Sequence, residues 1–280
     1  MNDVPRLGER QGKKERQLVF PENFLHTGMQ ITDEQAMQLV KFRNEYAYPA
    51  ARLVLDDHAG DFKLPGGQWA KIVPPAQGDV TDATLDAYHE RLLRSSNATE
   101  RLLGTASIVL WGFYTFSPAF AAIRVHRHLF GRGNQQATSA GQIADVLEEA
   151  DNAVKAGNPG RALEMFAGIN QLGRTPFASK VIALLDPRRT AVYDNRICKG
   201  LQNSPWAANG PFANGVGAVQ LRRVQREYAS WCSFTQAVAE QLNEGCLRGL
   251  PWHWRDRLNG PQMWRAIDVE RAIFAMFEPR

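Results

Sequence analysis

Residues 172–196 read LGRTPFASKVIALLDPRRTAVYDNR, and this stretch contains the residues on which the predicted fold and function of the chain depend. Lys180 interrupts an otherwise apolar run that has the spacing of a helix. Asp186-Pro187 ends that run, because the residue before a proline avoids the α-helical region. A lone aspartate, Asp194, then precedes the next helical pattern. The stretch therefore predicts a turn, a helix, an extended return and a second helix.

The predicted turn contains Gly173, Arg174 and Thr175. Gly173 is free to take the positive φ that a tight interhelical turn requires, and Pro176 suits the first helical position, where its missing N–H has no partner to lose. Amides at the start of a helix point outward with the positive end of its dipole, which is a suitable seat for a phosphate. An ordinary helix–helix turn is the commoner interpretation of such a sequence.

Lys180 lies at the flank of the apolar face that Phe177, Val181 and Leu184 form on the predicted helix. A lysine in this place can extend its ammonium into water, or it can be held partly desolvated in a cleft. Desolvation favours the neutral amine, which is a competent nucleophile. Both interpretations stay open on the sequence alone.

Asp194 is well placed to cap the following helix, NRICKGLQ, by accepting hydrogen bonds from its first amides. A capping carboxylate could equally face a developing cation. Fourteen positions separate Lys180 from Asp194, which is enough for a short helix and a return segment. We expect this arrangement to bring both side chains to the same end of the hairpin.

Length and composition bound the remaining possibilities. At 280 residues, with 44% apolar and 22% charged residues, the chain can bury a full core. It has no run of about 18 uninterrupted apolar residues, and its N-terminus is too polar for a secretory signal, so we expect a soluble cytoplasmic protein. The cysteines Cys198, Cys232 and Cys246 fit neither a disulfide framework nor a zinc site. No metal and no cofactor are expected.

The net charge of +4 is unevenly distributed along the chain. Residues 171–280 hold 15 Lys and Arg against 9 Asp and Glu, whereas residues 1–170 hold 18 against 20. A polyanion such as DNA would gain sequence-independent affinity at the C-terminal part through counterion release. A basic face that is merely solvated is the alternative.

Helical patterns dominate the organisation of the chain. Residues 1–17 are polar and basic and are predicted to be a mobile arm, which leaves 18–280 as the folded domain. The proline- and glycine-broken segment 59–80 is predicted to be a connector with at most a short strand at Trp69–Val73, and 204–217 should be irregular. Helices are expected from Thr32 and at about 82–94, 98–116, 118–130, 138–156, 159–170, 218–244 and 262–277.

These residues resemble the helix-hairpin-helix DNA glycosylases, especially the 8-oxoguanine DNA glycosylase branch. In that family a hairpin precedes a catalytic lysine at the start of a helix, and a catalytic aspartate caps the next helix. SKV at 179–181 is similar to the lysine site, and AVYDNR at 191–196 is similar to the aspartate site. The closing segment MWRAIDVERAIFAMF is similar to the last helix of bacterial proteins with this fold. The hairpin sequence LGRTP lacks the family's usual Gly-x-Gly pair, and the interval from lysine to aspartate is shorter than in better-known members.

The resemblance implies an all-α fold with two helical lobes and a cleft between them, in which about 160–203 is the hairpin and catalytic segment. It implies a glycosylase that flips a modified base out of double-stranded DNA. Asp194 would stabilise the positive charge that develops on the sugar, and Lys180 would attack it, with AP-lyase activity as a possible sequel. Gly173, Arg174 and Thr175 would bind DNA phosphate.

The resemblance leaves the excised base open. It would be an oxidised purine such as 8-oxoguanine, or a hypermodified base of phage DNA removed in phage defence. Trp252, Trp254 and Phe274 are candidate walls of the base pocket, although core packing is the commoner role for Phe274 and for Trp264. A nucleoid-associated enzyme needing no membrane, cofactor or obligate protein partner is expected. The alternative is a non-catalytic helix-hairpin-helix module that only binds nucleic acid.

Overall fold

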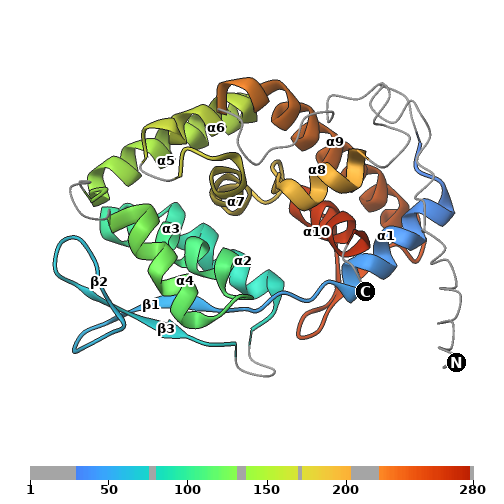
Figure 1. The fold of residues 1–280 in the computed structure, drawn as a ribbon. Coiled ribbons are helices and arrows are strands. Elements are labelled where there is room, and N and C mark those ends of the chain that lie inside the picture. The colour runs from blue at the N-terminus through green and yellow to red at the C-terminus, as the bar shows by residue number, and fades with distance from the viewer. Residues whose placement is uncertain (1–29, 76–79, 131–136, 170–171, 203–220, 278–280) are drawn as a thin grey trace, which may run out of the picture.

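The protein is mainly helical, as expected, and two small antiparallel sheets accompany the helices (Figure 1). The predicted arm at 1–17 and the predicted irregular segment at 204–217 lie outside the described residues. The computed structural model describes residues 30–75, 80–130, 137–169, 172–202 and 221–277.

The elements of the described chain have the following bounds. The α-helices are α1 (Asp33–Glu45), α2 (Asp82–Leu93), α3 (Ala98–Phe113), α4 (Pro118–Val125), α5 (Ala140–Lys155), α6 (Pro159–Met165), α7 (Thr175–Leu185), α8 (Asn195–Gln202), α9 (Leu221–Leu247) and α10 (Ala266–Met276). Two short helical turns are η1 (His126–Phe130) and η2 (Phe166–Gly168). The strands are β1 (Arg52–Asp56), β2 (Phe62–Lys63), β3 (Trp69–Val73), β4 (Trp254–Asp256) and β5 (Gly260–Gln262).

Helix starts follow the capping residues in the sequence. The side chain of Thr32 accepts from the Gln35 amide while the Gln35 side chain accepts from the Thr32 amide, so the predicted start of α1 is confirmed. Ser139 and Gln142 form the same reciprocal pair before α5. The helices expected at about 82–94, 98–116, 138–156 and 218–244 are confirmed as α2, α3, α5 and α9.

Three helices end or begin at residues that differ from those expected from the sequence. The helix expected over 118–130 leaves regular α geometry after Val125 and continues as the wider π turn η1. The helix expected over 159–170 stops at Met165 and tightens into the 3₁₀ turn η2. The last helix begins at Ala266, because the residues before it pair as the β4–β5 hairpin.

The connector predicted at 59–80 is part of a sheet. Its strand at Trp69–Val73 is confirmed as β3, whereas β1 and β2, which flank β3 in antiparallel register, were not expected. Gly66 and Gly67 both have positive φ, 105° and 94°, and supply the turn from β2 to β3. The buried Leu53 of β1 lies against α3, where its amide donates to Ser107 Oγ at 3.0 Å. The sheet therefore covers one side of a helical layer.

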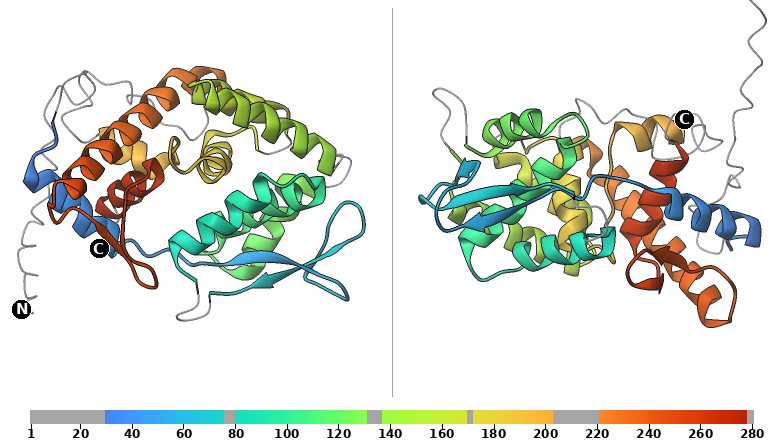
Figure 2. Two further views of the ribbon diagram at one scale, coloured as in Figure 1. Left: turned by 180° about the vertical axis from the view of Figure 1, so that it is seen from behind. Right: turned by 90° about the horizontal axis from the view of Figure 1, so that it is seen from below.

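Helix α7 lies between two groups of helices (Figures 1 and 2). In the first group α3 packs against α2, α4 and α5, and in the second α10 packs against α1, α8 and α9. Helix α7 contacts α2, α3, α5 and α6, and α6 also packs on α9. No helix of the described chain is long and apolar enough to cross a membrane.

A buried ion network joins α2 of the first group to α10 of the second. Asp86 of α2 accepts hydrogen bonds from both terminal nitrogens of Arg271, at 2.6 and 2.8 Å. Arg265, which precedes α10, adds a third hydrogen bond to the same carboxylate at 2.7 Å. Burial opposes the ionisation of Asp86, but these two arginines outweigh it and hold the pKa of the carboxyl below its usual range.

The network continues from α10 to α1. Asp268 accepts from Arg43 of α1 at 3.1 and 3.2 Å and from Arg265 at 2.8 and 3.1 Å. Arg43 also binds Asp82, the first residue of α2, at 3.0 Å. The network thus consists of three arginines and three aspartates, so its buried charges balance.

Removing one member of the network should destabilise the protein strongly. Asp86→Asn removes the main partner of Arg271 and leaves the buried network with three positive charges against two negative ones, and we expect a loss of about 3–5 kcal/mol in the free energy of unfolding. Urea denaturation measures this loss. The control is Glu100→Gln, which breaks an exposed ion pair with Arg91 at 4.0 Å and should cost less than about 1 kcal/mol. Equal losses for the two variants would contradict the importance of the network.

Candidate active site

Helix α7 holds Lys180 at the edge of the core. Pro176 is in the first turn of α7, as predicted, and Val181, Ile182 and Leu184 of this helix are fully or almost fully buried. The side chain of Lys180 is 12% exposed, so most of it is withdrawn from water. Of the two interpretations of this lysine, the desolvated one matches the structure.

Lys180 and Asp194 lie together, as the hairpin arrangement predicts. The Lys180 Nζ is 3.5 Å from Asp194 Oδ2, and the Asp194 side chain is 17% exposed. This separation exceeds the about 2.8 Å of a charge-assisted hydrogen bond. The amine is therefore beside the carboxylate without being tightly bound by it.

The second oxygen of Asp194 caps α8. Asp194 Oδ1 accepts from the amides of Arg196 at 3.0 Å and Ile197 at 3.1 Å, which confirms the predicted cap. The two carboxylate oxygens thus have separate partners, because Oδ1 contacts the helix start and Oδ2 contacts the amine. Capping fixes the direction of the carboxyl group and leaves one oxygen facing Lys180.

Ser179, which the sequence did not single out, aligns the two segments. Its Oγ accepts from the Tyr193 amide at 3.0 Å and lies at hydrogen-bonding distance, 3.2 Å, from the Tyr193 carbonyl. Ser179 and Tyr193 are the residues immediately before Lys180 and Asp194. Trp231 of α9 also donates to the Val192 carbonyl at 2.8 Å. The return segment is therefore held against both α7 and α9.

Glu270 of α10 is a third ionisable group at this site, and sequence reasoning missed it. The residue is 4% exposed, and its carboxyl has no hydrogen-bond partner within the described part of the chain. Burial raises the pKa of Glu270 to about 8, with a further upward contribution from the Asp194 carboxylate. Arg271 and Lys180 oppose the shift. The signal in the sequence was an acid within the largely apolar run of the last helix.

Aromatic rings and one glycine surround these groups. A Cβ on Gly112 of α3 would lie 3.0 Å from the Phe177 ring and 3.4 Å from Lys180 Cδ, so the absence of a side chain gives both residues room. The Phe177 ring centroid is 5.9 Å from Lys180 Nζ. Phe274, one turn after Glu270, lies 4.1 Å from the Arg196 guanidinium, next to the Asp194 segment. Phe274, a predicted pocket residue, therefore contacts the helix that Asp194 caps, and no described contact joins it directly to Lys180 or Asp194.

The other predicted pocket residues are located elsewhere. Trp252 packs against Gly245 of α9, and Trp254 lies 3.9 Å from the Arg43 guanidinium. Both tryptophans are buried, and no described contact joins either one to Lys180 or Asp194.

The predicted phosphate-binding turn is only partly as expected. Gly173 does not have a positive φ, so that expectation was wrong; a Cβ there would lie 3.2 Å from the Ala167 carbonyl oxygen, and close packing explains the glycine. Thr175 is fully buried, with no hydrogen-bond partner for its Oγ1 among the described residues, so its hydroxyl does not face solvent. Arg174 is exposed at the start of α7.

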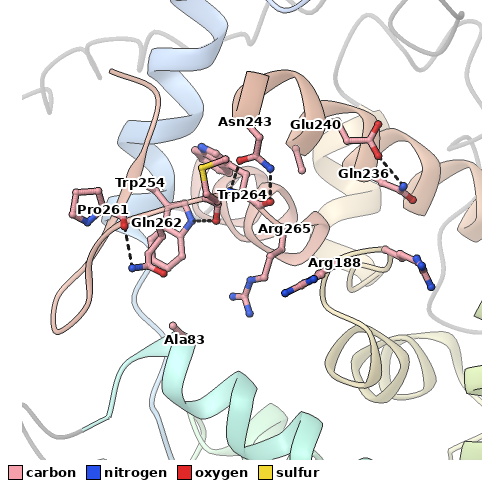
Figure 3. A pocket seen from close by; sticks show the side chains of 13 residues that line it. Ala83, Arg188, Gln236, Glu240, Asn243, Trp254, Pro261, Gln262, Trp264 and Arg265 are labelled. Atoms are coloured by element: carbon pink, nitrogen blue, oxygen red, sulfur yellow. Dashed lines mark hydrogen bonds between the residues drawn. The ribbon is translucent and has the colours of Figure 1, made fainter. Parts of the chain in front are cut away.

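A cavity of about 670 Å³ lies beyond the other end of α7 (Figure 3). It is bounded by the turn after α7, the start of α2, α9 and the β4–β5 hairpin. Arg188 and Arg265 point toward one another there, above a wall that includes Trp254 and Trp264 (Figure 3). Because Lys180 and Asp194 do not line it, this cavity is separate from the candidate active site.

The chain matches no protein-family model, no curated protein and no solved structure. Among the described residues, no group of three or more His, Cys, Asp or Glu side chains could hold a metal ion. Lys180, Asp194, Glu270 and the residues that position them are therefore the features of the chain that indicate a function.

Glu270 should make stability depend on pH. Because folding raises its pKa to about 8, the folded protein keeps a proton that the unfolded chain loses above about pH 4.3. The free energy of unfolding should therefore fall by up to about 1.4 kcal/mol per pH unit between about pH 5 and pH 8, and change little from this source outside that window. Glu270→Gln should abolish this contribution and be more stable than the parent at pH 8.

The measurement is chemical denaturation of the parent and Glu270→Gln across this pH range. Glu244→Gln, at an exposed position of α9, is the matched control and should leave the pH profile unchanged. If the profiles of the parent and Glu270→Gln run parallel, Glu270 does not retain its proton on folding.

Proposed function

We propose that the protein is a DNA glycosylase that excises a modified base from double-stranded DNA. The observation that carries the proposal is the 3.5 Å approach of Lys180 Nζ to Asp194 Oδ2 in a largely buried setting. Ser179 supports it, because its hydrogen bonds to Tyr193 hold the two reactive residues in one fixed arrangement.

The chemistry follows from the charge that develops on the sugar. As the bond from C1′ to the base breaks, the base leaves with the electron pair and the deoxyribose becomes positively charged. The Asp194 carboxylate stabilises this charge, and the preorganised cap at α8 keeps the carboxylate in place. Lys180, in its neutral form, donates its lone pair to C1′ and forms a C–N bond. The departing base takes up a proton.

The covalent adduct then accounts for strand cleavage. Ring opening gives a protonated imine between Lys180 and C1′. Loss of a C2′ proton and departure of the 3′ phosphate oxygen break the strand by β-elimination. Hydrolysis of the imine returns the lysine amine.

Glu270 sets the charge balance of the site. Because burial raises the pKa of Glu270 to about 8, Glu270 is neutral at pH 7 and Asp194 is the main negative charge beside the amine.

The stability cost of this arrangement also supports a functional role. An amine and two carboxyl groups gather where solvent access is low, and Glu270 has no hydrogen-bond partner in the described chain. Such a cluster contributes little to stability, because each ionisable group loses part of its hydration on burial. Glu270 has a strongly raised pKa, and groups with such shifts gather at functional sites.

Substrate and location follow the resemblance to the 8-oxoguanine DNA glycosylase branch. The substrate base is an oxidised purine such as 8-oxoguanine, or a hypermodified base of phage DNA. The latter would make the protein a defence enzyme. In either case it would act in the cytoplasm at the nucleoid, and the positive excess in residues 171–280 favours DNA as the partner.

Borohydride trapping tests the proposal. Duplexes that each contain one modified base are incubated with the protein, with and without borohydride, which reduces an imine to a stable amine. We expect a covalent protein–DNA adduct with one substrate. Lys180→Gln should form none, and Asp194→Asn should excise the base at least about a hundredfold more slowly. Both variants should retain DNA affinity.

Lys199→Gln is the matched control, because Lys199 is an exposed lysine on the helix that Asp194 caps. It should give the same adduct yield as the parent protein. DNA binding without any abasic product or adduct across the panel would instead favour the non-catalytic nucleic-acid-binding module.

A further inference from the structure

Exposed apolar side chains surround the turn between α3 and α4. Phe116 is 72% exposed, Ile123 is 62% exposed and Phe120 is 37% exposed. Large apolar side chains that gather on a surface mark contact sites more often than isolated ones do. This turn was not among the sites that the sequence indicated.

The phenylalanine rings form a continuous row from the surface to Lys180. Phe116 and Phe120 have ring centroids 5.4 Å apart, and both contact Phe113, at 6.4 and 5.8 Å. Phe113 stacks on Phe177 at 4.5 Å, and the Phe177 ring is 5.9 Å from the Lys180 amine. The exposed rings are thus connected to the candidate active site by direct contacts.

Arg124 adjoins this row, and Arg127 and Arg174 lie near Arg124. Arg124 of α4 lies 4.7 Å from the Phe113 ring centroid, and partial burial together with nearby Arg127 and Arg174 lowers its pKa. None of the three arginines has an acidic partner within the described part of the chain, and Arg124 Nε is buried without a hydrogen-bond acceptor there. Like charges that repel one another without a counter-charge would be relieved by a bound anion.

We propose that Phe116, Phe120, Arg124, Arg127 and Arg174 form the surface on which the protein holds DNA beside the flipped nucleotide. The arginines contact backbone phosphates, and the two phenylalanines stack on the bases that the flipped nucleotide leaves exposed. This arginine–phenylalanine surface deepens the proposed function and rests on it for the identity of the partner. Charge complementarity and exposed aromatic faces both fit a nucleic-acid strand.

The arginines are tested by the salt dependence of DNA binding. The probe is a short duplex with a central tetrahydrofuran, an abasic analogue without a base to excise. Removing two phosphate contacts with Arg127→Gln and Arg174→Gln should make the negative slope of log affinity against log salt shallower by about 2. The matched double variant, Arg161→Gln and Arg248→Gln, removes the same charge from exposed positions on α6 and after α9. It should leave the slope nearly unchanged.

The phenylalanines are tested separately with Phe116→Ala. Loss of base stacking should weaken binding to the tetrahydrofuran duplex by about five- to a hundredfold. Leu247→Ala, which truncates a side chain that is 80% exposed, is the control and should bind like the parent. Thermal unfolding of each variant checks that the fold is unchanged.

These binding measurements distinguish a failure of the proposed DNA-binding surface from a failure of the proposed glycosylase activity. If the two arginine double variants weaken binding equally, or if Phe116→Ala binds like Leu247→Ala, the proposed surface is wrong even when the parent excises a base. If the surface variants lose affinity as expected but no substrate is excised, the surface holds and the glycosylase function fails. If the parent and all variants bind anionic lipid vesicles with equal affinity and none binds DNA, both the proposed surface and the proposed glycosylase function are wrong.

Discussion

The orientation of α10 depends on the buried network of arginines and aspartates. Arg271 and Asp268 of this helix are bound to Asp86 of α2 and Arg43 of α1, so both neighbouring helices fix its rotation about its axis. An apolar interface of the same size could be equally stable, but it would accept small rotations that bidentate hydrogen bonds do not. With α10 fixed, Glu270 is held near Asp194 and Lys180. A structural network therefore places a functional candidate.

The candidate site shows how three ionisable groups can coexist in little water. Asp194 shares its charge between the amides that start α8 and the Lys180 amine, while Glu270 avoids its own charge by keeping a proton. The protonated Glu270 therefore does not repel the Asp194 carboxylate, and Asp194 is paired with the Lys180 amine. Such mutual adjustment costs stability, which the charge-balanced network and the apolar face of α7 offset.

Local patterns in the sequence predicted much of this arrangement. Capping residues and helical periods located most helices, and the spacing from Lys180 to Asp194 predicted their approach, because both effects act between residues close in the chain. The role of Glu270 and the pairing of the three-stranded sheet were not predicted, because they depend on contacts between segments that are distant in the sequence. Trp254 illustrates the same limit. As an aromatic residue it was a candidate wall of the base pocket, but tertiary packing places its ring against the Arg43 guanidinium.

The hydrogen bonds between Ser179 and Tyr193 have a consequence for motion. They tie together the backbone immediately before the amine and the backbone immediately before the carboxylate, within one hairpin. A hinge movement of one helical group relative to the other would therefore leave the distance between Lys180 Nζ and Asp194 Oδ2 nearly unchanged. The backbone between α7 and α8 thus fixes the geometry of the Lys180–Asp194 pair by itself, whatever the relative placement of the two groups of helices.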